Sequence, residues 1–209
     1  MNIYNYHNKP EKLHQHETVK MNMFWEQIDE PENFSKGVDF VLKDANRAYK
    51  YSALVIQGEW REGEDIIATD GGASYSYANI VLGQNRFPKG EDAIGKEASS
   101  SYYYAKFILD GRFPKGEDVM SKDDYFAYAY ARIIIHGEWK KGEDAIAEDG
   151  VRSYMYAKEV IKKRFPKGEA AIKQDGKHWE HYLEFLDGIK PVYKNEAARI
   201  ADTDPLGLF

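Results

Sequence analysis

Paired carboxylates are the residues of this chain whose types and spacing most resemble catalytic chemistry. A Glu-Asp pair recurs along the sequence, at Glu64/Asp65, Glu91/Asp92, Glu117/Asp118 and Glu143/Asp144. Two carboxylates can act as a general acid and base or bind a divalent metal ion. Adjacent residues on a helix do not face one another, however, and an active site does not usually recur once per structural unit. We therefore interpret the pairs as helix N-terminal charges, which offset the helix dipole.

Histidines are the other candidate metal ligands. They form two close pairs, His14/His16 and His178/His181, and a spacing of three residues lets two side chains of one helix share a metal. No third ligand accompanies either pair, so we expect no metal site. The chain also lacks a phosphate-binding loop, a GxSxG nucleophile motif, an HExxH motif and any cysteine. We expect no enzymatic activity, no catalytic residue and no cofactor.

Composition narrows the functional classes further. The chain has 209 residues, 29 Lys and Arg against 35 Asp and Glu, and a net charge of −6. Sequence-independent nucleic-acid binding relies on basic surfaces, so this charge does not favour it. No run of 18 apolar residues is present, and residues 1–20 are polar, without the apolar segment of a secretory signal. We expect a cytoplasmic protein that does not enter a membrane.

A tandem repeat must position all of these residues. The motif Phe/Trp-x-x-Gly-Glu recurs with steps of 27, 26, 26 and 26 residues, starting at Trp60, Phe87, Phe113, Trp139 and Phe165. A Tyr-x-Tyr block precedes each motif in phase, starting at Tyr49, Tyr75, Tyr102, Tyr128 and Tyr154. Such a short fixed period predicts a solenoid. Decayed copies at 21–44 and 177–190 are predicted to be caps, because the outermost units must present a soluble face.

Each repeat is predicted to contain two helices. With the first Tyr of the block as position 1, the apolar residues at positions 1, 3, 4, 7 and 8 form a stripe at the helical period. We expect positions 1, 4 and 8 on one face, and the tyrosine hydroxyls at the rim of the core. Phe-Pro-Lys-Gly then predicts a turn. A second helix of about two turns follows, and one apolar residue per copy is expected in its core: Ile67, Ile94, Met120, Ile146 and Ile172.

An acidic residue closes each repeat and is expected to cap the next helix. These residues are Asp70, Glu97, Asp123, Asp149 and Asp175. The predicted fold class is all-α, an α-solenoid of about five 26-residue two-helix repeats with degenerate capping repeats. The predicted organisation is a polar N-terminal segment at 1–20, the solenoid domain with its caps at 21–190, and a C-terminal tail at 191–209.

Binding is expected at columns that vary while the core repeats. Position 5 reads Ala53, Asn79, Lys106, Arg132 and Lys158, and position 2 reads Lys50, Ser76, Tyr103, Ala129 and Met155. Solenoids bind along such extended surface columns. We predict Lys106, Arg132, Lys158, Tyr103 and Met155 as binding residues, with an acidic surface on the partner. A solvated charged face is the structural alternative and stays open.

Two nucleic-acid alternatives also stay open. Aromatic columns can stack single-stranded bases, although these tyrosines share a face with Ala and Leu/Ile, which favours a core role. Acids spaced one repeat apart can mimic a phosphate backbone. A lysine two residues before each Glu would dilute that field, at Lys89, Lys115, Lys141 and Lys167.

The signature Tyr-x-Tyr-Ala…Arg-Phe-Pro-Lys-Gly-Glu, over about residues 34–190, resembles short tandem α/α repeats in proteins of bacteriophages and large DNA viruses. The two Glu-Trp copies, at Trp60 and Trp139, depart from the Arg-Phe-Pro form. The resemblance implies a viral origin and carries no assigned activity. The combined expectation is a non-enzymatic protein-binding module that binds and inhibits a host protein. The alternative is nucleic-acid binding, or nucleic-acid mimicry that inhibits a host defence protein.

Overall fold

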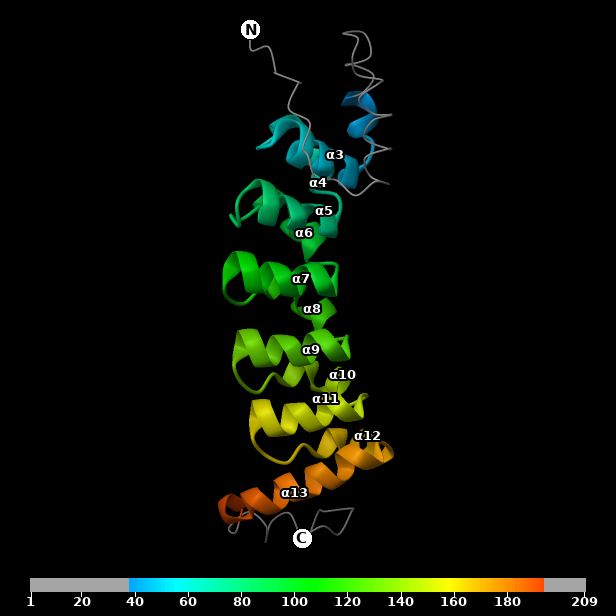
Figure 1. Ribbon diagram of the computed structural model, residues 1–209, viewed down its shortest axis with the longest axis vertical. Helices are drawn as coiled ribbons and strands as arrows, with labels where there is room; N and C mark the ends of the chain where they lie inside the picture. Colours follow the sequence, from blue (N-terminus) through cyan, green and yellow to red (C-terminus); the bar gives the residue numbers. More distant parts are fainter. Residues whose placement is uncertain (1–37, 194–209) are drawn as a thin grey trace. The chain divides into compact units, whose positions relative to one another are not determined.

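The computed structural model describes residues 38–193, and the elements within that range are all helical. The chain divides into two compact units, residues 1–117 and 118–209. In the first unit α3, α5 and α7 lie side by side, and in the second α9, α11 and α13 do so (Figure 1). The predicted all-α repeat solenoid is therefore confirmed. No helix among the described residues is long and apolar enough to cross a membrane.

The first helix of each repeat, helix A, begins as an α-helix and continues directly as a π-helix. The α-helical parts are α3 (Ala45–Tyr51), α5 (Gly71–Ser76), α7 (Ala98–Tyr104), α9 (Asp124–Tyr130) and α11 (Gly150–Met155). The π-helical parts are η1 (Ser52–Ile56), η3 (Tyr77–Val81), η5 (Ala105–Leu109), η7 (Ala131–Ile135) and η9 (Tyr156–Ile161). π-Helical turns are rare and were not predicted from the sequence.

The second helix, helix B, begins with one 3₁₀ turn. These turns are η2 (Arg61–Gly63), η4 (Pro88–Gly90), η6 (Pro114–Gly116), η8 (Lys140–Gly142) and η10 (Pro166–Gly168). The α-helical parts are α4 (Glu64–Ile67), α6 (Glu91–Ile94), α8 (Glu117–Met120), α10 (Glu143–Ile146) and α12 (Glu169–Gln174). The long helix α13 (Gly176–Tyr193) follows the last of them. The Glu-Asp pairs therefore lie in the first turn of helix B, as predicted.

The core of each unit is built on the tyrosine at position 3. These side chains are fully buried, at Tyr77, Tyr104, Tyr130, Tyr156 and Tyr182. Small residues flank them at position 4 and at position 0, which is the residue before the first Tyr of the block. These residues are also fully buried, as at Ser101 and Ala105. Position 4 of the predicted face is fully buried, as predicted, whereas the prediction is wrong for positions 7 and 8, because Ile108 and Leu109 and their equivalents are only half-buried. Positions 7 and 8 lie at the end of the π-helical part, next to the residue where helix A ends.

The turn before helix B requires glycine because of close approach. The Gly90 N–H donates to the Phe87 carbonyl at 3.0 Å, which closes the predicted four-residue turn. A Cβ atom on Gly90 would lie 2.5 Å from Ser74 Oγ and 2.6 Å from Phe87 Cδ1. The apolar residue of helix B is fully buried in each copy, as predicted, at Ile67, Ile94, Met120, Ile146 and Ile172.

Aspartates cap helix A where the repeat closes. Asp70, Asp123 and Asp149 each accept a hydrogen bond from the backbone N–H three residues later, at 2.7, 2.9 and 2.8 Å. Glu97 does not cap in this way, since its longer side chain accepts instead from Ser100 Oγ at 2.9 Å. Asp175 contacts His178, with 2.7 Å between the carboxylate oxygen and Nδ1.

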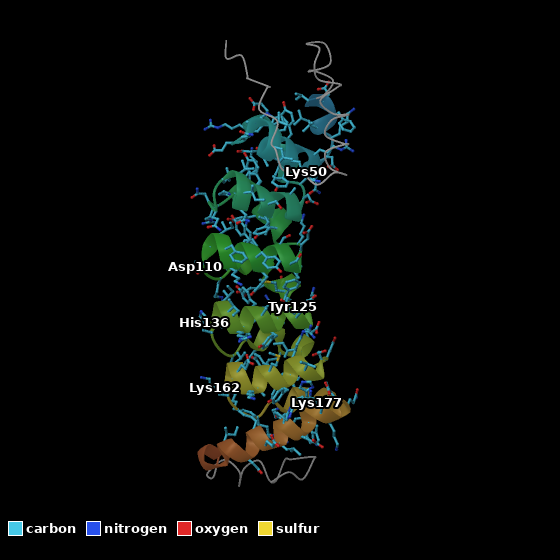
Figure 2. All side chains as sticks on the ribbon, viewed as in Figure 1. Lys50, Asp110, Tyr125, His136, Lys162 and Lys177 are labelled. Carbon is cyan, nitrogen blue, oxygen red and sulfur yellow. The ribbon has the colours of Figure 1, made fainter. Side chains whose placement is uncertain are left out.

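Helix A ends in a left-handed residue at position 9. The φ angles are 56° at Gln57, 44° at Asp110, 56° at His136 and 53° at Lys162. In the second unit, Figure 2 shows His136 and Lys162 at the loop ends of their helices. The N–H of this residue donates to the carbonyl at position 4, as from Asp110 to Ala105. Left-handed backbone is unfavourable for residues other than glycine, so these positions carry a small conformational cost.

The predicted ends of the array fall only partly within the described residues. α13 covers the C-terminal cap predicted at 177–190, and its Tyr182 continues the buried tyrosine column. That helix ends at Tyr193, three residues inside the tail predicted at 191–209. The polar segment at 1–20, the first part of the cap at 21–44 and the rest of the tail lie outside the described residues.

Candidate binding surface

Within each unit, the glutamates Glu64, Glu91 and Glu143 of the Glu-Asp pairs belong to the contact between consecutive repeats. The Tyr104 hydroxyl donates to Glu91 Oε1 at 3.1 Å and accepts from the Phe87 N–H at 3.0 Å. The same two bonds recur at Tyr77, Tyr156 and Tyr182, with distances of 2.8–3.3 Å. The hydroxyls at position 3 thus lie inside the contact, and the prediction that they reach a rim is wrong for this position. Burial, together with the nearby Glu91 charge, raises the pKa of Tyr104 to about 12.

An arginine completes this contact in the Arg-Phe-Pro copies. Arg86 pairs with Glu91 at 2.6 Å, Arg112 with Glu117 at 2.8 Å, and Arg164 with Glu169 at 2.6 Å. The Glu-Trp copies have Glu59 or Glu138 in the place of the arginine. The glutamate is buried in the arginine copies, whereas Glu64 and Glu143 of the Glu-Trp copies are only half-buried. Each arginine therefore covers a carboxylate that the Glu-Trp copies leave closer to water.

The aspartate of each pair contacts a lysine from the following repeat. The four ion pairs are Lys89–Asp65 at 2.9 Å, Lys115–Asp92 at 2.6 Å, Lys141–Asp118 at 2.5 Å and Lys167–Asp144 at 2.6 Å. The hydrogen bond from Lys115 lowers the pKa of Asp92, and that from Lys141 lowers the pKa of Asp118. The Glu-Asp pairs therefore hold neighbouring repeats together, and lysines neutralise the exposed acids.

The structure describes one of the two histidine pairs, His178 and His181. His178 contacts Asp175, and its ring centroid lies 5.7 Å from that of Tyr154 and 6.4 Å from that of His181. Among the described residues, no group of three or more His, Asp or Glu side chains is arranged to hold a metal ion. His14 and His16 lie outside those residues.

The outer face of helix A carries exposed aromatic rings in the first unit. Tyr103 and Phe107 are 37% and 44% exposed, and their rings stack with 6.1 Å between centroids. Tyr75, from the preceding helix A, stacks on Tyr103 at 6.0 Å. We call Tyr75, Tyr103 and Phe107 the aromatic ladder. Ile80, at the position equivalent to Phe107 one repeat earlier, is 60% exposed. This surface is apolar although it faces water.

Lys106 lies beside the aromatic ladder. Its Nζ atom is 4.9 Å from the Phe107 ring centroid and 5.9 Å from that of Tyr102. A cation over a ring face is attracted by the ring quadrupole, and this attraction holds the ammonium group against the apolar surface. The predicted residues Tyr103 and Lys106 therefore belong to one surface of the first unit.

The other predicted binding residues lie in the second unit. Arg132 pairs with Glu159 at 3.1 Å and donates to the Tyr128 hydroxyl at 3.2 Å. Lys158 donates to the Tyr154 hydroxyl at 2.8 Å, and Met155 is half-buried. These two position-5 cations thus bind polar groups of their own unit.

Sequence reasoning missed Tyr75, Phe107 and Ile80. A usable signal is present at position 6, which carries Leu54, Ile80, Phe107 and Ile133 before Glu159. Positions 2 and 6 are four residues apart and lie on the same helix face. The apolar residues at position 6, together with Tyr103 at position 2, therefore indicate an outward apolar stripe beside the core stripe.

Comparisons of the chain with protein-family models, with curated proteins and with solved structures gave no match.

Proposed function

We propose that this chain is a non-enzymatic binding protein that recognises a protein partner through the outer face of helix A, centred in the first unit on the aromatic ladder. The exposure of the stacked rings Tyr103 and Phe107 is the observation that carries the proposal. Large apolar groups grouped together on the surface typically mark interaction sites, whereas single exposed ones need no explanation. Aromatic residues are also enriched at the energetic centres of protein interfaces.

The fold does not need the ladder rings for its core. The buried contact between repeats is supplied by other positions of the same helix, through Tyr104, Ser101 and Ala105, and the ladder adds to it only the stacking of Tyr75 on Tyr103. Tyr103 and Phe107 leave more than a third of their surface in water, so their hydrophobic area is available to a second molecule. A partner that covers both rings would remove that area from water without rearranging the core.

Two observations favour a protein partner over a nucleic acid. The ladder rings lie against one another, with Tyr103 between Tyr75 and Phe107, so bases cannot insert between them. Lys106 is the cation held over the Phe107 ring, whereas nucleic-acid binding sites combine aromatic rings with a continuous basic groove. The pairing of the aspartate of each Glu-Asp pair with a lysine likewise weakens the alternative of phosphate mimicry.

We also propose, as expected from the sequence, that the partner is a host protein in the cytoplasm. Binding inhibits this protein by covering its surface. These statements rest on the resemblance to viral repeat proteins, and the ladder supports only the interaction itself.

Photo-cross-linking tests the proposal. p-Benzoylphenylalanine replaces Phe107 in the chain expressed in its native cells, and a second variant carries the same group in place of Lys177, an exposed residue of the second unit (Figure 2). We expect a discrete adduct from position 107 that protease removes and nuclease does not. Adducts of equal yield at both positions, or adducts removed by nuclease, would contradict a protein-binding site at the ladder.

A further inference from the structure

The second unit contains its own example of a carboxylate bound on the outer face. Arg132 at position 5 and Tyr128 at position 1 of one helix A both contact Glu159 Oε2, each at 3.1 Å. Glu159 is at position 6 of the next helix A. The same outer face therefore binds a carboxylate when a neighbouring helix supplies one.

The first unit presents the cation without that carboxylate. Lys106 occupies position 5, and its contacts among the described residues are with the rings of Tyr102 and Phe107. The residues in the column of Glu159 are apolar in the earlier copies, at Leu54, Ile80, Phe107 and Ile133. Over the part of the first unit that the structure describes, a lysine for which no acidic partner is seen thus lies beside exposed apolar side chains.

We propose that this face of the first unit binds an acidic amphipathic peptide segment of the partner, an inference that rests on the proposed function. A carboxylate of the segment pairs with Lys106, in the manner of Glu159 with Arg132. An adjacent apolar side chain of the segment covers Tyr103 and Phe107. Charge complementarity and the internal example in the second unit both specify this chemistry.

The position of the ammonium group explains why both features are needed together. Lys106 Nζ lies 4.9 Å from the Phe107 centroid, so a carboxylate that pairs with it lies close to the ring as well. An apolar neighbour of that carboxylate then excludes water, which strengthens the ion pair through the lower local dielectric constant. A purely acidic segment lacks this gain, and a purely apolar one leaves the lysine charge unpaired under the interface.

A peptide selection tests the inference. A displayed library of random 12-residue peptides is selected on the immobilised full chain and counter-selected on its Lys106→Glu variant. We expect enriched peptides that place Asp or Glu next to Leu, Phe or Trp. A synthetic peptide from this pool should bind about tenfold more weakly to Lys106→Glu and to Phe107→Ala. Lys96→Glu, the control at an exposed lysine of α6–α7, should bind it normally.

The outcomes separate this inference from the proposed function. Peptides that need Phe107 but are indifferent to Lys106→Glu would overturn the acidic partner and leave the binding face standing. Enrichment of basic peptides, or no enrichment over the counter-selection variant, would also overturn the inference. Competition by a 20-nucleotide oligothymidylate for binding at Phe107 would replace both proposals with single-strand recognition. Far-UV circular dichroism on each variant confirms that a lost interaction does not reflect unfolding.

Discussion

Tyr103 and Tyr104 are adjacent on α7 and yet have opposite surroundings. Tyr104 is fully buried, and its hydroxyl joins the Phe87 N–H to the Glu91 carboxylate across the repeat contact. Tyr103 is 37% exposed and stacks with rings on the outer face. The buried face carries the same residue type in copy after copy, whereas the exposed face changes at each copy. Repetition therefore marks the residues that hold the array together, and variation marks the surface available for recognition.

Alkaline pH should give the largest loss in the free energy of unfolding, because it ionises the buried tyrosines. Tyrosine ionises near pH 10 in an unfolded chain, but burial raises the pKa of Tyr104 to about 12 and also raises those of Tyr77, Tyr156 and Tyr182. Their stabilisation is complete below pH 10 and is lost as the pH rises from 10 toward the folded-state values. Each such tyrosine contributes a slope of about 1.4 kcal/mol per pH unit in that window.

Urea unfolding followed by circular dichroism between pH 9 and 12 measures this slope. The free energy of unfolding should fall by several kcal/mol, because several tyrosines act together. Tyr104→Phe should flatten the profile, because it removes one of the buried hydroxyls whose pKa is raised. A pH-independent free energy of unfolding up to pH 12 would contradict the buried hydrogen-bonded hydroxyls.

Glycine at the turn should be nearly as critical. Gly90→Ala places a Cβ 2.5 Å from Ser74 Oγ and should cost about 3 kcal/mol, because the well-packed turn has no room to relax. Gly137→Ala is the matched control, since a Cβ there has no atom within 4 Å. Thermal unfolding should show a clear loss for the first variant and little change for the second. Equal melting temperatures would show that the turn yields at little cost.

The repeat architecture could be predicted because it depends on a pattern in the residues alone. The period of Trp60, Phe87, Phe113, Trp139 and Phe165 and the Ile column of helix B identified both helices and their core contacts. The π-helical half of helix A could not be predicted, since Ala105 and Leu109 read equally well as ordinary α-helix. With an ordinary α-helix assumed, positions 7 and 8 were predicted to lie in the core, whereas they are only half-buried.

The candidate surface was predicted only in part. Variation identified Tyr103 and Lys106, but it gave no means of seeing that Tyr75 from the neighbouring helix stacks on Tyr103. The Glu-Asp pairs were correctly interpreted as structural, although their partners lie 13 and 23 residues away, at Tyr104 for Glu91 and at Lys115 for Asp92. Such contacts follow from how repeats stack and not from any local pattern.

Removal of one buried hydroxyl should have an intermediate effect. Tyr104→Phe leaves the Phe87 N–H and the Glu91 carboxylate without their shared partner and should cost about 2 kcal/mol. Tyr103→Phe, on the adjacent exposed residue, should change the free energy of unfolding by less than about 0.5 kcal/mol. Urea titration at pH 7 compares the two variants. Equal losses in the free energy of unfolding would contradict the different roles of the buried and exposed faces.

The left-handed helix ends should give the smallest effect, and one of opposite sign. Lys162 has a φ angle of 53°, so Lys162→Gly relieves backbone strain and should stabilise the chain by about 0.5 kcal/mol, after the entropy cost of glycine. Lys177→Gly within α13 is the control and should destabilise it by a similar or larger amount. A lower melting temperature for Lys162→Gly would show that its side chain outweighs the strain.

We propose that the exposed rings of the aromatic ladder serve recognition, whereas the buried tyrosines serve stability. The most direct measurement pairs the melting temperature with the affinity for a selected acidic peptide, in Tyr103→Ala/Phe107→Ala and in Tyr104→Phe. We expect the ladder variant to keep its melting temperature within a few degrees and to lose binding of the peptide. Tyr104→Phe should melt earlier and, where folded, bind the peptide as the unmodified chain does. A ladder variant that unfolds at lower temperature than Tyr104→Phe while it retains the peptide would contradict the account.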